Sequence, residues 1–181
     1  MQTEEIKIEY AAQTSSRFQK GRLMKIAVIS DSHRVKRYMD NAIEIIQEEG
    51  TDLILHAGDN FCDSIYLKEK TGIPVIAVAG NCDFDNVETE LDFECEGLTI
   101  FLTHGHHYGV KYGLHTLAEE AAGVGANIAI FGHTHVKENE IVDGVQIINP
   151  GSLAMPRDGR DRSFVMMELN DGSYTFEYRF I

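Results

Sequence analysis

Long hydrophobic runs are missing from this chain of 181 residues. No apolar stretch approaches the roughly 20 residues that a membrane-spanning helix needs, and the N-terminus lacks the apolar core of a signal peptide. Internal repeats and low-complexity segments are absent as well. We therefore expect one globular domain without a membrane partner, and 43% hydrophobic residues are enough for a full core.

Positive charge is also scarce. The chain has 16 Lys and Arg against 29 Asp and Glu, a formal net charge of −13. A protein that grips nucleic-acid backbone needs dense Lys and Arg, so this composition disfavours a nucleic-acid polymer as partner. A pocket made positive by metal ions would still accept a small anionic substrate.

Cysteine is rare and has no metal-binding or redox spacing. The three cysteines are Cys62, Cys82 and Cys95, an odd number without a CxxC pair. This usage is typical of free thiols in a reducing compartment rather than of a disulfide framework. We expect a cytoplasmic protein.

Residues 1–23 differ from the rest of the chain. A short alternating stretch is followed by a polar segment, and Met24 stands directly before the first apolar run and would serve as a start by itself. We expect residues 1–23 to be a disordered or non-native extension, with an oligomer-contacting arm as the alternative. Residues 24–181 form the folded domain.

Five short apolar runs each end directly in metal-ligand residue types. The five junctions are Asp31-Ser32-His33, Gly58-Asp59-Asn60, Gly80-Asn81-Cys82-Asp83, His104-Gly105-His106 and Gly132-His133-Thr134-His135. Short β-branched runs bounded by Gly and polar residues predict strands buried on both faces. Ligands of such sheets bind beyond the strand ends, so these side chains are expected to meet at one place.

Helices alternate with the first strands and are absent from the last third. Helical spacing is present over 39–46, 62–70 and 112–122. Strand patterns follow at 138–142, 145–149, 163–169 and 174–180, and Asp143-Gly144 and Asp171-Gly172 predict two hairpin turns. We expect an α/β fold whose second sheet is largely antiparallel and packs face to face on the first.

The candidate ligands form a set of seven: Asp31, His33, Asp59, Asn81, His104, His133 and His135. Seven ligands are too many for one tetrahedral ion and suit two ions that share a carboxylate, either Asp31 or Asp59. Mixed nitrogen and oxygen donors favour Mn, Fe, Zn, Ni or Co over Mg. Two divalent ions against two carboxylates leave about two positive charges, which suits phosphoester hydrolysis by a metal-bridging hydroxide.

In this order and spacing, the five junctions resemble the signature of calcineurin-like metallophosphoesterases. The resemblance extends from Met24 to the C-terminus. Gly80-Asn81-Cys82-Asp83 and the later Asn149-Pro150-Gly151-Ser152 resemble the small stand-alone prokaryotic phosphodiesterase branch. This family implies a two-sheet sandwich flanked by helices, with an α/β/β/α order of layers. The branch implies a phosphodiesterase that uses manganese or a similar metal, and a homodimer or homotetramer.

The resemblance also implies how the ligands divide. It gives Asp31, His33 and His135 to one ion and Asn81, His104 and His133 to the other, with Asp59 as the bridge. Many family members carry His where this chain has Cys82, and that His helps to protonate or hold the leaving group. A thiol with an ordinary pKa near 8.5 is a poorer acid than imidazolium, so His106 is a second candidate for this role. Asp83 completes the catalytic candidates, with a supporting or turn role as the simpler interpretation.

Three residues are candidate substrate contacts: Asn60, His106 and Arg157. For Asn60 the alternative is a cap of the following turn or helix, and for Arg157 it is a solvated position. The main prediction is hydrolysis of small phosphodiesters. The alternatives are a phosphomonoesterase or protein phosphatase on the same site, and a non-catalytic scaffold like the retromer subunit with this fold. Cyclic nucleotides, nucleotide-derived diesters, phospholipid head groups and signalling diesters all stay open as substrates.

Overall fold

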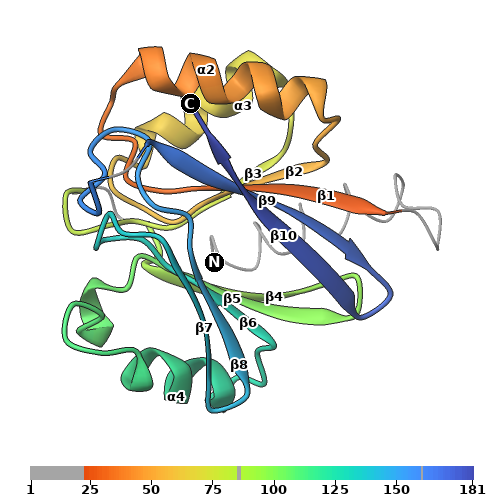
Figure 1. Ribbon diagram of the computed structural model, residues 1–181, viewed down its shortest axis with the longest axis vertical. Coiled ribbons are helices and arrows are strands. Elements are labelled where there is room, and N and C mark those ends of the chain that lie inside the picture. The colour runs from red at the N-terminus through yellow and green to blue at the C-terminus, as the bar shows by residue number, and fades with distance from the viewer. Residues whose placement is uncertain (1–22, 85–86, 160) are drawn as a thin grey trace.

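The computed structural model describes residues 23–84, 87–159 and 161–181, which form two five-stranded sheets (Figure 1). The predicted N-terminal extension lies outside these residues except for Leu23, which is exposed. None of the described helices is long and apolar enough to cross a membrane.

The first sheet has the order β10-β9-β1-β2-β3. Its strands are β1 (Met24–Ile29), β2 (Leu53–His56), β3 (Val75–Ala77), β9 (Ser163–Asn170) and β10 (Ser173–Phe180). The three N-terminal strands run parallel, with Val28 opposite Leu55 and Leu55 opposite Ile76. Helices α2 (Lys36–Glu48) and α3 (Cys62–Thr71) supply the crossovers that parallel neighbours require.

The second sheet has the order β4-β5-β6-β8-β7. Its strands are β4 (Glu90–Cys95), β5 (Leu98–Thr103), β6 (Ile128–Ile130), β7 (Glu138–Val142) and β8 (Val145–Asn149). Strands β5, β6 and β8 run parallel, whereas β4 and β7 pair antiparallel at the edges. A short 3-10 turn, η1 (His106–Tyr108), and helix α4 (His115–Gly123) connect β5 to β6.

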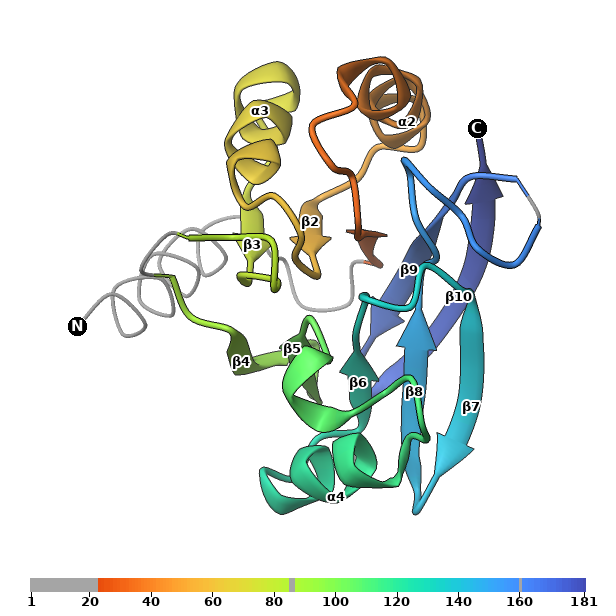
Figure 2. The same cartoon turned by 90° about the vertical axis from the view of Figure 1, so that its left-hand side faces the viewer.

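Each central strand has two buried faces, because side chains alternate along a strand. In β1, Val28 packs between the two sheets, whereas Ile29 packs under α2 and α3. In β6, Ile130 faces the other sheet and Ala129 faces α4. Figures 1 and 2 show the resulting layers, with α2 and α3 covering one sheet and α4 covering the other. The predicted α/β sandwich flanked by helices is confirmed.

Local sequence signals are confirmed in detail. The four apolar residues with helical spacing in α2 (Met39, Ala42, Ile43 and Ile46) are all buried. Each hairpin turn has two residues with positive φ, as a tight hairpin turn requires. In the first turn, φ is 52° at Asp143 and 85° at Gly144. Helix α4 begins at His115 instead of residue 112. Its buried residues Leu117, Ala118 and Ala121 fit either start, so the apolar pattern does not fix the first turn.

The prediction of a largely antiparallel second sheet is wrong. The two C-terminal hairpins separate: β7 and β8 join the second sheet, whereas β9 and β10 join the first. Both sheets are therefore mixed, since β8 pairs parallel with β6 and β9 pairs antiparallel with β1. Turn signals identify the partners within a hairpin but carry no information about which distant strand lies beyond it.

Candidate metal centre

The candidate ligands follow strands whose carboxyl ends point to the same end of the sandwich. Hydrogen bonds join the loops within the second sheet and between the two sheets. The Gly132 N–H donates to the His104 carbonyl at 3.2 Å, and the His133 N–H donates to Asp31 Oδ2 at 3.1 Å. The loops after β1, β5 and β6 therefore form one structure rather than separate surface segments.

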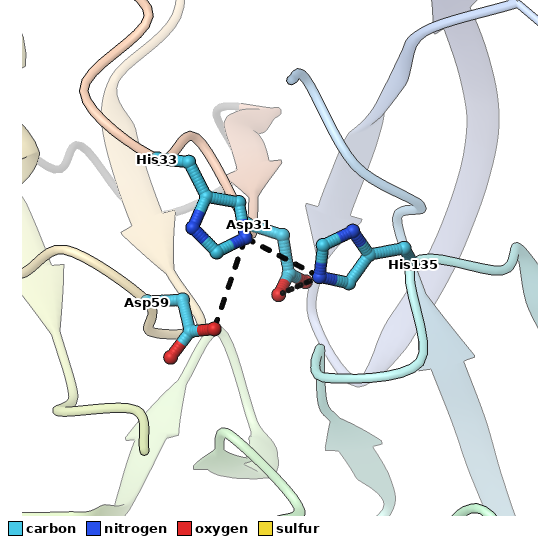
Figure 3. A group of neighbouring side chains, drawn as sticks. All are labelled: Asp31, His33, Asp59 and His135. Carbon is cyan, nitrogen blue, oxygen red and sulfur yellow. Dashed lines mark hydrogen bonds and ion pairs between the residues drawn. The ribbon is translucent and has the colours of Figure 1, made fainter. Parts of the chain in front are cut away.

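Four candidate ligands form a compact cluster, shown in Figure 3: Asp31, His33, Asp59 and His135. One ligand atom from each lies within 4.8 Å of the others. His33 Nε2 lies 3.3 Å from His135 Nε2, and His135 Nε2 lies 3.1 Å from Asp31 Oδ1. Two imidazoles and two carboxylates converging in this way are a typical donor set for a divalent transition metal.

Asp59 lies between two groups of histidines. Its Oδ2 is 3.8 Å from His33 Nε2, and its Oδ1 is 3.3 Å from His104 Nε2. Burial alone would raise the pKa of Asp59, but the neighbouring His104 and a hydrogen bond from the Cys82 N–H hold that pKa well below its usual range. The carboxylate is ionised at neutral pH and presents one oxygen to each group.

Two histidines are oriented by backbone carbonyls. His104 Nδ1 lies 2.7 Å from the Ala57 carbonyl, and His135 Nδ1 lies 2.8 Å from the Met155 carbonyl. A carbonyl oxygen only accepts, so each Nδ1 donates its proton and leaves the Nε2 lone pair directed into the site. This carbonyl contact is how proteins fix the tautomer of a metal-binding histidine.

The residues present fit a bound cation. Asp31 Oδ1 and His104 Nε2 are buried, yet neither has a hydrogen-bond partner within the described part of the chain. Buried polar atoms without partners cost about 1–3 kcal/mol each, and such atoms are uncommon in native proteins. Coordination of these two atoms by bound cations would remove that cost.

Backbone strain gathers at the same residues. Five of the seven candidate ligands have positive φ: Asp31, His33, Asp59, His133 and His135, with values between 46° and 66°. This region is sparsely populated by residues other than Gly, and such conformations cluster at functional sites. The loops therefore hold these side chains in positions that a relaxed turn would not give.

Two glycines allow the loops to approach the ligands closely. A Cβ on Gly132 would lie 1.9 Å from Ser30 Oγ and 2.8 Å from Asp31 Oδ2. A Cβ on Gly80 would lie 2.2 Å from Asp59 Oδ1. Any side chain at either position would displace the neighbouring carboxylate.

The other three candidate ligands are His133, His104 and Asn81, and they differ in burial and in the side chains that they contact. The ring of His133 lies 5.1 Å from that of His104, between centroids, and burial, His104 and Lys111 lower its pKa to about 4. His104 is fully buried beside Asp59. Asn81 is exposed, and its amide nitrogen lies 3.5 Å from Cys82 Sγ. That contact does not bring the Asn81 side chain to the cluster.

The three predicted catalytic residues have different environments. Cys82 is exposed, and its N–H donates to Asp59 Oδ1 at 3.0 Å. Burial and the contact with Asp59 raise the pKa of its thiol to about 11.

The ring of His106 lies 5.5 Å from that of His104, and its Nδ1 is buried without a partner among the described residues. Asp83 accepts hydrogen bonds from the N–H groups of Gly80, Asn60 and Phe61 at 2.7–3.2 Å, so its carboxylate ties the two loops together.

The alternative role considered for Asn60, a cap of the following helix, is wrong. Helix α3 has no side-chain cap, and Asn60 Oδ1 instead accepts a hydrogen bond from Arg34 Nε at 2.8 Å. Asn60 Nδ2 lies 3.3 Å from His33 Nδ1, so this side chain supports a candidate ligand. The Arg157 side chain is exposed, and its backbone N–H donates to the His135 carbonyl at 3.0 Å.

Two buried residues support the site although no role was predicted for them. Asn149 Nδ2 donates to the Gly132 carbonyl at 2.8 Å and to Thr134 Oγ1 at 3.1 Å. Ser152 Oγ donates to the Asp31 carbonyl at 2.8 Å. Both residues belong to the Asn149–Ser152 segment. Its position at the end of a predicted strand was the sequence feature from which a role at the site could have been predicted.

The fold and this cluster define a metal-dependent phosphoesterase. The family model of the calcineurin-like phosphoesterase superfamily domain matches residues 24–172. The chain therefore belongs to the calcineurin-like phosphoesterase superfamily and is a phosphoester hydrolase.

Curated relatives and solved structures agree with this assignment. The chain is 31% identical over 156 residues to a probable metallophosphoesterase, YsnB of Bacillus subtilis, covering 86% of this chain and 90% of that protein. It is 33% identical over 150 residues to phosphodiesterase MJ0936 of Methanocaldococcus jannaschii, covering 71% and 83%. A predicted phosphoesterase from Streptococcus pneumoniae superposes with a TM-score of 0.73 at 27% identity, covering 88% and 90%. Vps29 of Entamoeba histolytica shares the fold, with a TM-score of 0.68 at 24% identity, covering 87% and 99%.

Proposed function

We propose that this chain hydrolyses small phosphodiesters at a site that holds two divalent cations. The observation that carries the proposal is the convergence of pre-oriented donor atoms around Asp59, two of which, Asp31 Oδ1 and His104 Nε2, are buried without a hydrogen-bond partner among the described residues. His104 and His135 are fixed through Nδ1, and Asp59 offers one oxygen to each side. Nitrogen and oxygen donors arranged in this way suit coordination of divalent cations.

The proposed ligands divide into two sets that share one carboxylate. Asp31, His33 and His135 would hold one ion, Asn81, His104 and His133 would hold the other, and Asp59 would serve both. For Asn81 this requires rotation of an exposed side chain away from Cys82. The mixed nitrogen and oxygen donors suit Mn, which we take as the preferred ion, or Fe, Zn, Ni or Co.

Two bound divalent cations would lower the pKa of a water molecule and neutralise charge on the phosphate oxygens. Two carboxylates against two such ions leave about two positive charges, which favour an anionic substrate although the chain carries a net charge of −13. The chain's own residues position that substrate. His106 has a buried ring nitrogen free for a hydrogen bond, Cys82 lies beside Asp59, and Asn60 and Arg157 border the same loops.

Support for a diester rather than a monoester comes from the relatives. One of them, MJ0936, is named a phosphodiesterase. The acidic surface disfavours polymeric nucleic acid, so the proposed substrate is a small molecule in the cytoplasm. The proposed assembly is a homodimer or homotetramer.

The test is turnover of a chromogenic phosphodiester and its matching monoester by metal-stripped protein titrated separately with Mn, Ni, Zn and Mg. We expect metal-dependent hydrolysis that favours the diester and is highest with Mn. Preference for the monoester would instead indicate a phosphatase. No turnover with any metal, from protein shown to be folded by circular dichroism, would refute catalysis and favour a scaffold role.

A further inference from the structure

A groove of about 580 Å³ adjoins the metal centre, a volume within the range of small-molecule sites. Thr134 lines the groove and stands between the candidate ligands His133 and His135 in the sequence. Arg157 also lines it, and its backbone N–H donates to the His135 carbonyl. The groove therefore lies beside the loop that carries His133 and His135.

The floor of the groove is apolar. Val110 and Phe131 are nearly fully buried beneath it, and Leu114 and Val136 are partly buried along it. These side chains come from the η1–α4 connection and from the loop between β6 and β7. A flat apolar group lying on this floor would be removed from water.

One wall of the groove is acidic because of the alternation along β7. Glu138, Glu140 and Val142 share one face of the strand. Glu140 pairs with Ile147 and Val142 pairs with Val145, and both partners belong to the apolar cluster around α4. The face of Glu140 therefore turns toward the groove, whereas Ile141 points to the opposite side and is 72% exposed.

Two cations lie among the lining residues near the metal centre. Lys111 and Arg157 are exposed and line the groove. Within residues 23–84, 87–159 and 161–181, neither side chain forms a salt bridge. The groove thus combines available positive charge, an apolar floor and an acidic wall.

We propose that this groove binds one ester group of the substrate, and that the group is a nucleoside or a heterocycle of similar size. This inference rests on the proposed phosphodiesterase function and identifies nucleotide-derived diesters as its substrate class. The base stacks on the apolar floor, its N–H groups (the ring N3–H in thymine) donate to Glu138 and Glu140, and Lys111 and Arg157 flank the phosphate. A quaternary ammonium head group fits less well, because the described lining offers no exposed Trp or Tyr face.

The kinetic test uses the full chain loaded with Mn and two esters that share a leaving group. These are thymidine 5′-(4-nitrophenyl phosphate) and methyl 4-nitrophenyl phosphate. We expect kcat/KM to favour the nucleoside ester by about tenfold or more. Glu140→Trp, which fills the groove, is expected to bring this ratio close to one. Ile141→Trp is the matched control on the opposite face of the same strand, and it retains the wild-type ratio. A wild-type ratio near one, or the same fall in both variants, would overturn the inference.

A binding experiment separates this inference from the proposed function. Calorimetry with thymidine 5′-monophosphate and methyl phosphate does not require turnover. Tighter binding of the nucleotide, weakened by Glu140→Trp and retained in Ile141→Trp, supports the groove even if neither ester is hydrolysed. Equal binding of the two phosphates, or tighter binding of phosphocholine than of the nucleotide, contradicts it.

Discussion

Ser152 should be a strong determinant of both stability and metal affinity. Its side chain is fully buried. Ser152 Oγ donates to the Asp31 carbonyl at 2.8 Å and accepts hydrogen bonds from the N–H groups of Ala154 at 3.1 Å and Met155 at 2.9 Å. The Met155 carbonyl in turn accepts from His135 Nδ1. One hydroxyl therefore holds the backbone around two candidate ligands.

The expected magnitude follows from these three hydrogen bonds. Ser152→Ala removes all three. The Ala154 N–H still donates to the Asp31 carbonyl at 3.3 Å, whereas the Met155 N–H loses its Ser152 partner. At about 1 kcal/mol for each bond, the free energy of unfolding should fall by roughly 3 kcal/mol. Since groups that orient metal ligands typically affect affinity by about 10–100-fold, Mn should bind at least about tenfold more weakly.

Denaturant unfolding of metal-free protein and calorimetric titration with Mn measure the two effects separately. Chelation is needed in the first assay because bound metal would itself stabilise the folded state. Ser163→Ala is the matched control, since the Ser163 side chain is buried but makes one hydrogen bond within the described residues, from Oγ to the Pro150 carbonyl at 2.7 Å. The control should lose about 1 kcal/mol and keep its Mn affinity. If Ser152→Ala loses no more stability than the control, or binds Mn as wild type does, the reasoning is refuted.

Three further substitutions test the site. Asp59→Asn should reduce metal content from two ions and lower diester turnover by at least about 100-fold; metal analysis that finds both ions in an active variant would rule out the bridging role. Gly132→Ala places a Cβ 1.9 Å from Ser30 Oγ and should cost about 1–3 kcal/mol of stability. Thermal unfolding checks this against Gly123→Ala, whose Cβ has no atom within 4 Å, and equal effects would contradict the packing argument. Cys82→His should preserve or raise turnover, most clearly for poor leaving groups. Complete loss of activity in a folded Cys82→His variant would show that the position cannot host an acid.

Much of the fold could be read from local patterns. Apolar spacing placed α2 and its buried residues Ile43 and Ile46 correctly, and Asp-Gly pairs identified both hairpins. The sequence patterns could not predict which of the two sheets each hairpin joins. Strand β9 pairs with β1 across more than a hundred residues, and alternation shows only which face is buried, not which strand lies beside it.

The candidate site shows the same division. The order of the sequence motifs predicted Asp31, His33, Asp59 and His135 as metal ligands. The structure places the donor atoms of these four residues together. Their supports escaped prediction. Ser152 and Asn149 act through backbone carbonyls and N–H groups, which any sequence supplies at every position.

The sequence by itself determined the family, the alternation of strand and helix, and the residue types that converge at the strand ends. These features depend on residue identity and short-range periodicity. Only the tertiary structure decided how the strands divide between the sheets, how Asp59 stands between two groups of histidines and where the groove under β7 lies. Those features arise from contacts between segments distant in the chain. Such contacts depend on backbone geometry and packing that no single stretch of sequence encodes.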